Sequence, residues 1–258
     1  MIMSWLRVGV RVVLIALLTV VFWVLLLAGT LLTALWPKTR VRCRGFIFKT
    51  WSRLLLLVIG VEVETVGKPP DLPFFLVSNH LSYLDILVLA SRASVVFIAK
   101  AEIADWPLVG LICKSVNTIF IDRRARREIP RVIAHIDREL DLGAGIVLFP
   151  EGTSSKGDSV MLFRPSLLEV ASRSDTPVSF AALRYDIPEG GPPAHLAVCW
   201  WGEVPFGAHL LGLLAVRRIH AKVVFGDKQL HDTDRKQLAL RLHAALLERF
   251  ESTAQETE

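Results

Sequence analysis

Hydrophobic residues dominate the start of the chain, and a mixed pattern of apolar and polar positions follows. From Val12 to Trp36 there are 25 consecutive residues without a charged side chain. A helix of that length is about 37 Å long, whereas crossing the hydrocarbon core of a bilayer takes only about 20 residues. The apolar part of a cleaved signal peptide is shorter, about 7–15 residues, and no small-residue cleavage site is obvious here. The pattern therefore predicts a retained membrane anchor.

A second apolar stretch, residues 46–60 (FIFKTWSRLLLLVIG), carries Lys49 and Arg53 among bulky apolar side chains. Its charge-free part is too short to span, and its pattern is typical of an amphipathic helix that lies at the membrane interface. The two stretches could instead pack as a hairpin that dips into one leaflet. We therefore assign residues 1–60 to a membrane anchor, transmembrane or leaflet-dipping, and residues 61–258 to a globular domain.

In this second part, short β-branched or apolar runs alternate with longer helical ones. The predicted strands are 61–66, 74–78, 95–99, 118–122, 146–150, 178–183, 195–199 and 219–225. The predicted helices are 83–91, 106–114, 127–141, 164–173, 207–215 and 233–250, the last with Asp232 or Thr233 as its N-cap. This alternation predicts an α/β fold, with a mostly parallel central sheet flanked by helices.

The charge of the chain is unevenly distributed. Residues 1–61 hold eight Lys or Arg and no Asp or Glu, although the whole chain carries a net charge of only +5. Because this basic segment is also the most apolar one, a bilayer with anionic lipids is a better partner than nucleic acid. Basic residues are denser after the apolar stretch than before it, so the positive-inside rule places residues 38 onward on the cytoplasmic side of the inner (plasma) membrane.

The three cysteines, Cys43, Cys113 and Cys199, are scattered and odd in number. They match neither a metal-ligand spacing nor a disulfide framework, and a reduced compartment fits them. We expect no metal ion and no bound cofactor.

Three polar motifs each follow a predicted strand. NHLSYLD follows 74–78, DRRARR closes 118–122, and PEGTSSKG follows 146–150. Ligands of open α/β sheets bind beyond the carboxyl ends of the strands, so three motifs at this edge predict one shared site.

Within NHLSYLD, Ser82 and Asp85 have the spacing of a capping box, which by itself favours a structural role. His80 adds chemistry, because an imidazole in the loop can meet Asp85 in the first helical turn. A carboxylate on one ring nitrogen fixes the tautomer and leaves the other nitrogen to accept a proton. Ser82 is a poor nucleophile candidate, since the chain has no G-x-S-x-G elbow. The attacking hydroxyl would then come from a substrate.

With IFIDR, FPEGT and the intervening AKAEIADWPLVG, the NHLSYLD motif resembles the lysophosphatidic acid and glycerol-3-phosphate acyltransferases over about residues 70–185. The resemblance implies that His80 deprotonates the acceptor hydroxyl, which attacks an acyl thioester, and that Asp85 orients His80. It implies acyl-CoA or acyl-carrier protein as donor and a lyso-phospholipid, 1-acyl-glycerol-3-phosphate, as acceptor. The product would be phosphatidic acid, an intermediate of phospholipid biosynthesis, and residues 61–258 would be the acyltransferase catalytic domain.

Five further residues are predicted to bind substrate. Arg123 suits bidentate phosphate recognition, and the family pattern makes Lys100 a second phosphate ligand. Glu151 would accept a hydrogen bond from a glycerol hydroxyl or steady Arg123. Gly152 permits close backbone approach, and Thr153 completes the matched EGT motif. PEGTSSKG is not a P-loop, because the Lys and Ser/Thr after its second glycine are missing.

The chain departs from the family pattern at two motif positions. Asn117 stands where the second motif usually has glycine, and Ser154 where the third often has arginine. The missing arginine weakens the case for a phosphate-bearing acceptor, unless Lys156 or Arg164 replaces it. The alternative acceptor is another lyso-lipid, such as lyso-ornithine lipid. A protein that binds lipid without turnover, and a thioesterase or hydrolase, are the rival classes.

Overall fold

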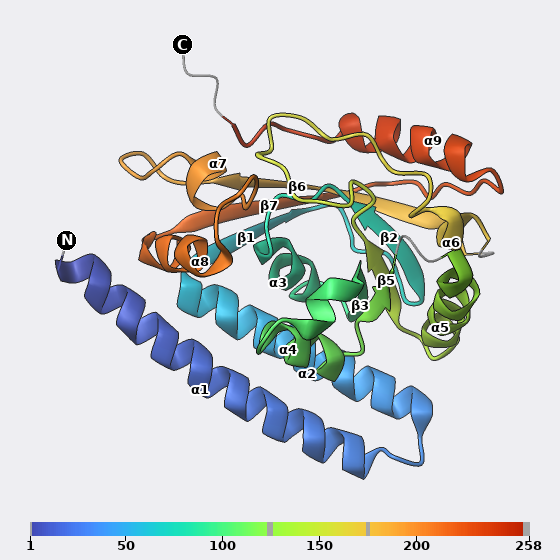
Figure 1. Cartoon of the computed structure of the whole chain (residues 1–258), viewed down its shortest axis with the longest axis horizontal. Helices are drawn as coiled ribbons and strands as arrows, with labels where there is room; N and C mark the ends of the chain where they lie inside the picture. The colour runs from blue at the N-terminus through green and yellow to red at the C-terminus, as the bar shows by residue number, and fades with distance from the viewer. Residues whose placement is uncertain (1, 123–125, 174–175, 255–258) are drawn as a thin grey trace.

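A seven-stranded sheet forms the centre of the computed structural model, which describes residues 2–122, 126–173 and 176–254 (Figure 1). The strand order is β1-β7-β6-β2-β5-β3-β4, and every pair is parallel except β6 with β7. The predicted α/β fold with a mostly parallel sheet is confirmed. The strands are β1 (Val61–Val66), β2 (Phe74–Ser78), β3 (Val95–Lys100), β4 (Ile119–Ile121), β5 (Gly145–Leu148), β6 (Val178–Asp186) and β7 (Ile219–Phe225).

Helices cover both faces of this sheet. The α-helices are α1 (Ile2–Leu32), α2 (Pro37–Ile59), α3 (Leu84–Ala90), α4 (Val109–Ser115), α5 (Ile129–Asp141), α6 (Glu169–Ser172), α7 (Ala194–Ala197), α8 (Phe206–Ala215) and α9 (Arg235–Leu247). Two 3₁₀-helices, η1 (Ala101–Asp105) and η2 (Arg126–Glu128), join them. One hydrophobic cluster joins the sheet to α1, α2, α3 and α8, and a second joins it to α5, α6 and α9.

The burial of each strand follows its place in the sheet. All residues of β2 and β5, at the centre, are buried, because helices cover both faces there and the strands read as unbroken apolar runs. In β7, buried and half-buried residues alternate strictly, as expected of a strand whose second face is less covered.

Some predicted elements are wrong in type or position. Residues 195–199 do not form a strand: α7 begins after Pro193 and packs beside α8. A short apolar run is compatible with either structure, so its pattern could not decide. The predicted helix 164–173 is α-helical only at α6, Glu169–Ser172. The helix predicted at 106–114 corresponds to α4, which starts three residues later, at Val109. The N-cap of α9 is Asp234, whose carboxylate accepts a hydrogen bond from Lys236 N, rather than Asp232 or Thr233.

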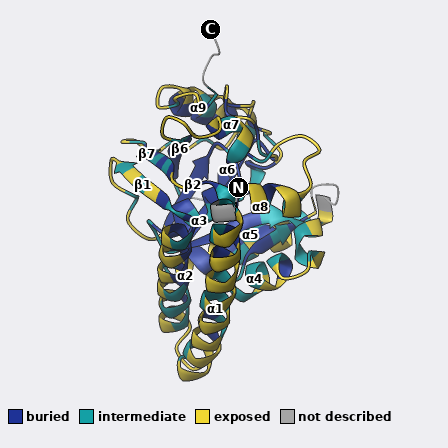
Figure 2. Ribbon diagram, turned by 90° about the vertical axis from the view of Figure 1, so that its left-hand side faces the viewer, coloured by how far each residue is buried: buried dark blue, intermediate teal, exposed yellow. Residues whose placement is uncertain are grey.

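The N-terminal segment forms a helical hairpin along one side of the domain (Figures 1 and 2). α1 ends at Leu32, earlier than the predicted Trp36, and α2 starts at Pro37. α2 lies between α1 and the sheet, and Trp51 stacks on Phe22 of α1 with ring centroids 4.6 Å apart. Most apolar side chains of α2 therefore contact protein, which the prediction of an interfacial helix for 46–60 did not anticipate.

α1 buries only one stripe of side chains against α2 and the domain. Val8, Ile15, Phe22 and Leu26 recur at helical spacing on that stripe. The other faces of α1 are apolar and exposed, at Trp5, Leu6, Val10, Val13, Leu14, Leu17, Val20, Val21, Val24, Leu25, Leu27, Leu31 and Leu32 (Figure 2). A contiguous apolar surface of this size is unfavourable in contact with water, so it requires a bilayer or a protein partner to cover it.

Two arginines dock the N-terminal end of α1 onto α8. Arg11 is 8% exposed, and its Nη1 donates to the carbonyl oxygens of Leu214 at 2.8 Å and Val216 at 2.5 Å. Arg7 Nη1 donates to Ala215 O at 2.7 Å. These carbonyls belong to the C-terminal end of α8 and the residue after it, where helical acceptors lack partners and a cation is favourable. At the other end of the hairpin, Arg44 of α2 forms a salt bridge with Glu139 of α5.

Candidate active site

The described site residues lie at the carboxyl ends of three neighbouring strands, β2, β5 and β3. β2, β5, β3 and β4 are adjacent and mutually parallel. His80 follows β2, Glu151 follows β5, and Lys100 ends β3. Adjacent strands are about 4.8 Å apart, so these ends line one edge of the sheet. Arg123, expected just after β4, lies outside the described residues.

His80 and Asp85 contact each other. Nδ1 of His80 lies 2.7 Å from Oδ2 of Asp85. A carboxylate at that distance is an acceptor, so Nδ1 carries the proton and Nε2 keeps a lone pair. The His80 side chain is 21% exposed, whereas that of Asp85 is fully buried. The imidazole is therefore both oriented and accessible, as a general base requires.

Asp85 also organises the loop that carries His80. Its Oδ2 accepts hydrogen bonds from the backbone N–H groups of Leu81 at 2.7 Å and Ser82 at 3.0 Å. One carboxylate thus holds both the loop before α3 and the imidazole. Ser82 is fully buried, and its Oγ accepts from Leu84 N at 3.3 Å, so it supports the start of α3 and is not placed as a nucleophile. The N-cap residue of α3 is Tyr83, whose side chain makes no capping hydrogen bond.

The second oxygen of Asp85 binds a residue that no motif indicated. Tyr185, on β6, is fully buried and donates its hydroxyl to Oδ1 of Asp85 at 2.7 Å. Burial, reinforced by the negative charge of Asp85, raises the pKa of Tyr185 well above its ordinary value. Tyr185 lies 100 positions after Asp85 in a mostly buried strand, so no motif or spacing pointed to it; the one available sign was a tyrosine hydroxyl within a mostly apolar run.

Asn79 ties the loop to the same strand. Its Nδ2 donates to Leu183 O at 2.9 Å, and its Oδ1 accepts from Leu183 N at 2.7 Å. The side-chain amide thereby extends the pairing of β2 with β6 beyond Ser78. These hydrogen bonds fix the backbone directly after β2, and hence the position of His80.

Glu151 holds the other side of the loop. Its Oε1 accepts from His80 N at 2.9 Å and its Oε2 from Met161 N at 3.3 Å, and the residue is only 1% exposed. Burial, with a smaller contribution from Asp85, raises the pKa of Glu151 to about 8, although both backbone donors oppose the rise. A direct contact of Glu151 with substrate stays a prediction, because in this structure its carboxyl group binds the loop.

Aromatic stacking fixes the plane of the His80 ring. It lies on Phe149 with ring centroids 4.1 Å apart and planes 14° apart, and Phe149 stacks in turn on Phe97. His80 O accepts a hydrogen bond from Ser155 N at 2.9 Å. The ring and the backbone of His80 are thus both constrained.

The remaining predicted substrate residues differ in exposure. Lys100 is half-buried and Thr153 is exposed, while Gly152 is buried with a φ of 79° and donates its N–H to Phe149 O. That backbone conformation favours glycine. The roles of these residues in binding substrate stay predictions. Across the residues that the structure describes, no three His, Cys, Asp or Glu side chains gather into a possible metal site.

Both departures from the family pattern have a structural context. Asn117 has a φ of 64°, a left-handed conformation that glycine adopts freely and asparagine tolerates better than most residues. Ser154 donates its hydroxyl to Trp200 O, so it links loops rather than supplying charge. Lys156, a possible replacement for the missing arginine, pairs with Asp158 at 2.8 Å.

An aromatic cluster connects the His80 loop to α8. Tyr83 packs against Phe206 of α8 with ring centroids 5.1 Å apart, and Trp106 and Trp200 pack against the same ring. The Tyr83 hydroxyl lies 3.0 Å from His209 Nδ1. Because His209 Nε2 lies 3.0 Å from Cys199 O, Nε2 is the donor and Nδ1 accepts from Tyr83.

Comparison with known proteins identifies similar chains. Residues 60–182 match the family model "Acyltransferase". A lyso-ornithine lipid O-acyltransferase of Brucella abortus is 35% identical over 202 residues, covering 73% of this chain and 76% of that protein. A 1-acyl-sn-glycerol-3-phosphate acyltransferase of Neisseria gonorrhoeae is 31% identical over 192 residues, covering 73% and 72%.

Among solved structures, the 1-acyl-sn-glycerophosphate (LPA) acyltransferase PlsC of Thermotoga maritima has a similar fold. The TM-score is 0.56 at 18% sequence identity, over 96% of this chain and 100% of that one.

Proposed function

Since this chain belongs to the acyltransferase family, we propose that it moves a fatty acyl group from an acyl thioester to the free hydroxyl of a lyso-lipid in the membrane. It is an enzyme of the O-acyltransferase class. The proposed donor is acyl-CoA or acyl-carrier protein. The observation that carries the proposal is the 2.7 Å contact between Asp85 and the partly exposed ring of His80.

The geometry supports a direct transfer. Nε2 of His80 takes the proton of the acceptor hydroxyl while that oxygen attacks the thioester carbonyl carbon. The imidazolium that forms is stabilised by the Asp85 carboxylate beside Nδ1. The carbon–sulfur bond then breaks, and the departing thiolate takes the proton from His80. The products are an ester and a free thiol, and His80 returns to its starting state.

The acceptor has two candidates. The sequence predicts 1-acyl-glycerol-3-phosphate, whose acylation gives phosphatidic acid. A specific observation favours lyso-ornithine lipid: Ser154 replaces an arginine and binds Trp200 O, while Lys156 is paired with Asp158. A phosphate monoester needs more positive charge than an ornithine headgroup, which carries its own ammonium. The similarity to lyso-ornithine lipid O-acyltransferases supports the same choice.

The protein associates with the membrane through its N-terminal hairpin. By length and composition α1 can cross a bilayer, with a candidate span of Ser4–Leu32. Spanning would put Arg7 and Arg11 on the opposite side from residues 38 onward, yet both arginines bind α8 of the globular domain. We therefore infer that the hairpin enters one leaflet and stays on the side of the domain. A cytoplasmic location remains part of the proposal.

The test is an acceptor panel. Purified protein in detergent micelles receives labelled acyl-CoA or acyl-carrier protein together with lyso-ornithine lipid, 1-acyl-glycerol-3-phosphate or glycerol-3-phosphate. We expect transfer to lyso-ornithine lipid to be fastest. His80→Ala should lower the rate by roughly 10²–10⁴-fold, the usual contribution of a general base, while the thermal unfolding profile stays close to that of wild type.

Each other outcome has a defined meaning. Transfer to 1-acyl-glycerol-3-phosphate alone would overturn the acceptor choice but would still support acyl transfer with His80 as the base. Release of free fatty acid without an acceptor would indicate a thioesterase. A folded His80→Ala variant with wild-type turnover would refute the assignment of the base.

A further inference from the structure

We propose that Tyr185 is a positioning residue of the acyl transfer, whose hydroxyl holds the Asp85 carboxylate in the orientation that His80 requires. The inference rests on the proposed function, because it gives Tyr185 a task only if His80 is the base. Tyr185 belongs to none of the sequence motifs and reaches the site only through the fold.

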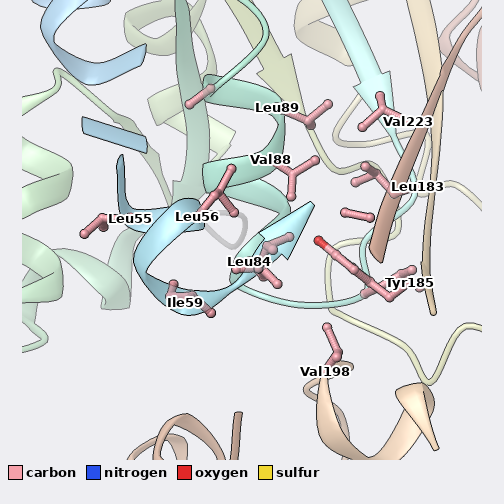
Figure 3. Packing of buried hydrophobic residues seen from close by; sticks show 14 of the residues in the cluster. Leu55, Leu56, Ile59, Leu84, Val88, Leu89, Leu183, Tyr185, Val198 and Val223 are labelled. Atoms are coloured by element: carbon pink, nitrogen blue, oxygen red, sulfur yellow. The ribbon is translucent and has the colours of Figure 1, made fainter. Parts of the chain in front are cut away.

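The buried position of Tyr185 directs its hydroxyl to Asp85. The side chain extends from β6 among Leu84, Leu183 and Val198, with its oxygen pointing toward the start of α3 (Figure 3). The ring is fully buried, so the hydroxyl cannot exchange its partner for bulk water. A buried hydroxyl without an acceptor is costly, and Oδ1 of Asp85 is the acceptor at 2.7 Å.

The donors around Asp85 divide between its two oxygens. Oδ2 receives His80 Nδ1–H and the N–H groups of Leu81 and Ser82, all from the loop itself. Oδ1 receives the Tyr185 hydroxyl from the opposite side. Donors on both oxygens fix the rotation of the carboxylate plane, and with it the direction in which Oδ2 faces the imidazole.

The same hydrogen bond gives the buried carboxylate a donor on its second oxygen, since the donors of the loop all bind Oδ2. Tyr185 can serve throughout the working pH range, because burial and Asp85 raise its own pKa far above neutrality. The other titratable groups that face Asp85 are His80, Glu151 and Cys199; burial, with a smaller effect of Asp85, raises the pKa of the Cys199 thiol, which stays neutral.

Tyr185→Phe tests the inference, since it removes one oxygen and keeps the ring. We expect kcat to fall by roughly 10-fold to 100-fold, the effect of leaving one oxygen of a buried charged group without its donor. The KM values for both substrates should stay within about two-fold, because Tyr185 is fully buried and acts through Asp85. The acid limb of the kcat/KM profile should move to higher pH, since the His80–Asp85 pair then binds its proton more readily.

Two controls separate positioning from packing. Tyr83→Phe removes the only other tyrosine hydroxyl of the chain, which contacts His209 and not Asp85, so it should keep the wild-type acid limb. In an Asp85→Asn background, Tyr185→Phe should cause little further loss of kcat, because the two residues act through one contact.

The contradicting result is equally specific. If wild type transfers acyl groups, His80→Ala abolishes transfer, and folded Tyr185→Phe keeps both the kcat and the pH profile of wild type, then the role of Tyr185 is refuted and the proposed function stands. If wild type shows no transfer, the proposed function itself fails.

A second measurement tests the inference even if the Tyr185→Phe variant does not fold. With Tyr83→Phe as background, Tyr185 is the sole tyrosine, and growth on 3-fluorotyrosine converts it to a stronger donor of nearly the same shape. The acid limb should then move to lower pH, opposite to the effect of removing the hydroxyl. An unchanged profile in the fluorinated protein would refute the inference.

Discussion

At the scale of single residues, Asp85 combines structure and chemistry in one carboxylate. The spacing of Ser82 and Asp85 predicts a capping box, and the nearby His80 predicts a catalytic pair. In the structure Asp85 contacts both the His80 ring and the backbone N–H of Ser82. The two contacts are compatible because a carboxylate accepts several hydrogen bonds at once, and the N–H groups of Leu81 and Ser82 bind the same oxygen that contacts His80.

Glu151 gives a prediction about stability at this scale. Burial raises its pKa from 4.5 to about 8, so between those pH values the folded protein holds a proton that the unfolded chain has released. The stability contributed by Glu151 is therefore full below about pH 4.5 and is lost as the pH rises through about 8, at up to about 1.4 kcal/mol per pH unit.

The comparison of wild type with Glu151→Gln measures this effect. Gln cannot titrate, so the unfolding free energy of wild type should decline relative to that of the variant as the pH rises from about 5 to about 8. Denaturant titrations in detergent at several pH values provide the numbers. Parallel pH profiles for the two proteins would show that Glu151 is already ionised over this range.

At the scale of elements, α8 joins the N-terminal hairpin to the loop that carries His80. Its C-terminal carbonyls are bound by Arg7 and Arg11 of α1, and its other end packs on Tyr83 through Phe206. Helix C-terminal carbonyls have no partners within the helix, so the arginines supply what α8 lacks. Accordingly, α1 begins at Ile2 and includes Arg7 and Arg11, ahead of the charge-free stretch that starts at Val12.

Arg11→Met should destabilise the fold, because it keeps the bulk of the side chain but leaves buried carbonyls without donors. We expect a loss of about 2–4 kcal/mol in unfolding free energy and a lower acyl transfer rate, since α8 then holds Tyr83 less firmly. Arg42→Met is the matched control on an exposed position of α2 and should change stability by less than about 0.5 kcal/mol. Equal stability of the Arg11 and Arg42 variants would show that the contacts to α8 contribute nothing.

At the scale of the whole molecule, the hairpin and the domain share one hydrophobic cluster. Side chains of α1 and α2 pack with those of β2, β3 and α3, so the anchor is built onto the core rather than tethered by a linker. The outer faces of α1 remain apolar and exposed (Figure 2). The hairpin is bound to the domain at both ends, through Arg7 and Arg11 at one and Arg44 at the other, and its outer face is apolar and exposed. This arrangement matches a hairpin that enters one leaflet.

Thiol labelling in sealed inner-membrane vesicles tests this arrangement. In a background without native cysteines, Trp5→Cys reports on the N-terminal end of α1 and Glu248→Cys on the domain. We expect a membrane-impermeant reagent to label both from the same side, because Arg7 and Arg11 hold that end of α1 on α8. Labelling of the two positions from opposite sides would show that α1 spans the bilayer.

The sequence by itself determined what depends on short distances along the chain. Alternating apolar runs predicted the seven strands of the sheet in order, and uninterrupted apolar residues predicted α1. His80 and Asp85 are five positions apart at a strand–helix junction, so their contact follows from local geometry. The positions of Lys100 and Glu151 at the same edge follow from parallel strands, whose carboxyl ends meet on one side.

Only the tertiary structure decided what depends on residues far apart. Tyr185 reaches Asp85 across 100 positions, and Arg11 reaches α8 across more than 200. Neither contact leaves a periodic signal, because a tyrosine in a buried strand or an arginine in an apolar helix fits many environments. The segment 195–199 was mispredicted for the same reason: its apolar residues suit a strand or a helix, and in the structure residues 195–197 belong to α7, which packs beside α8.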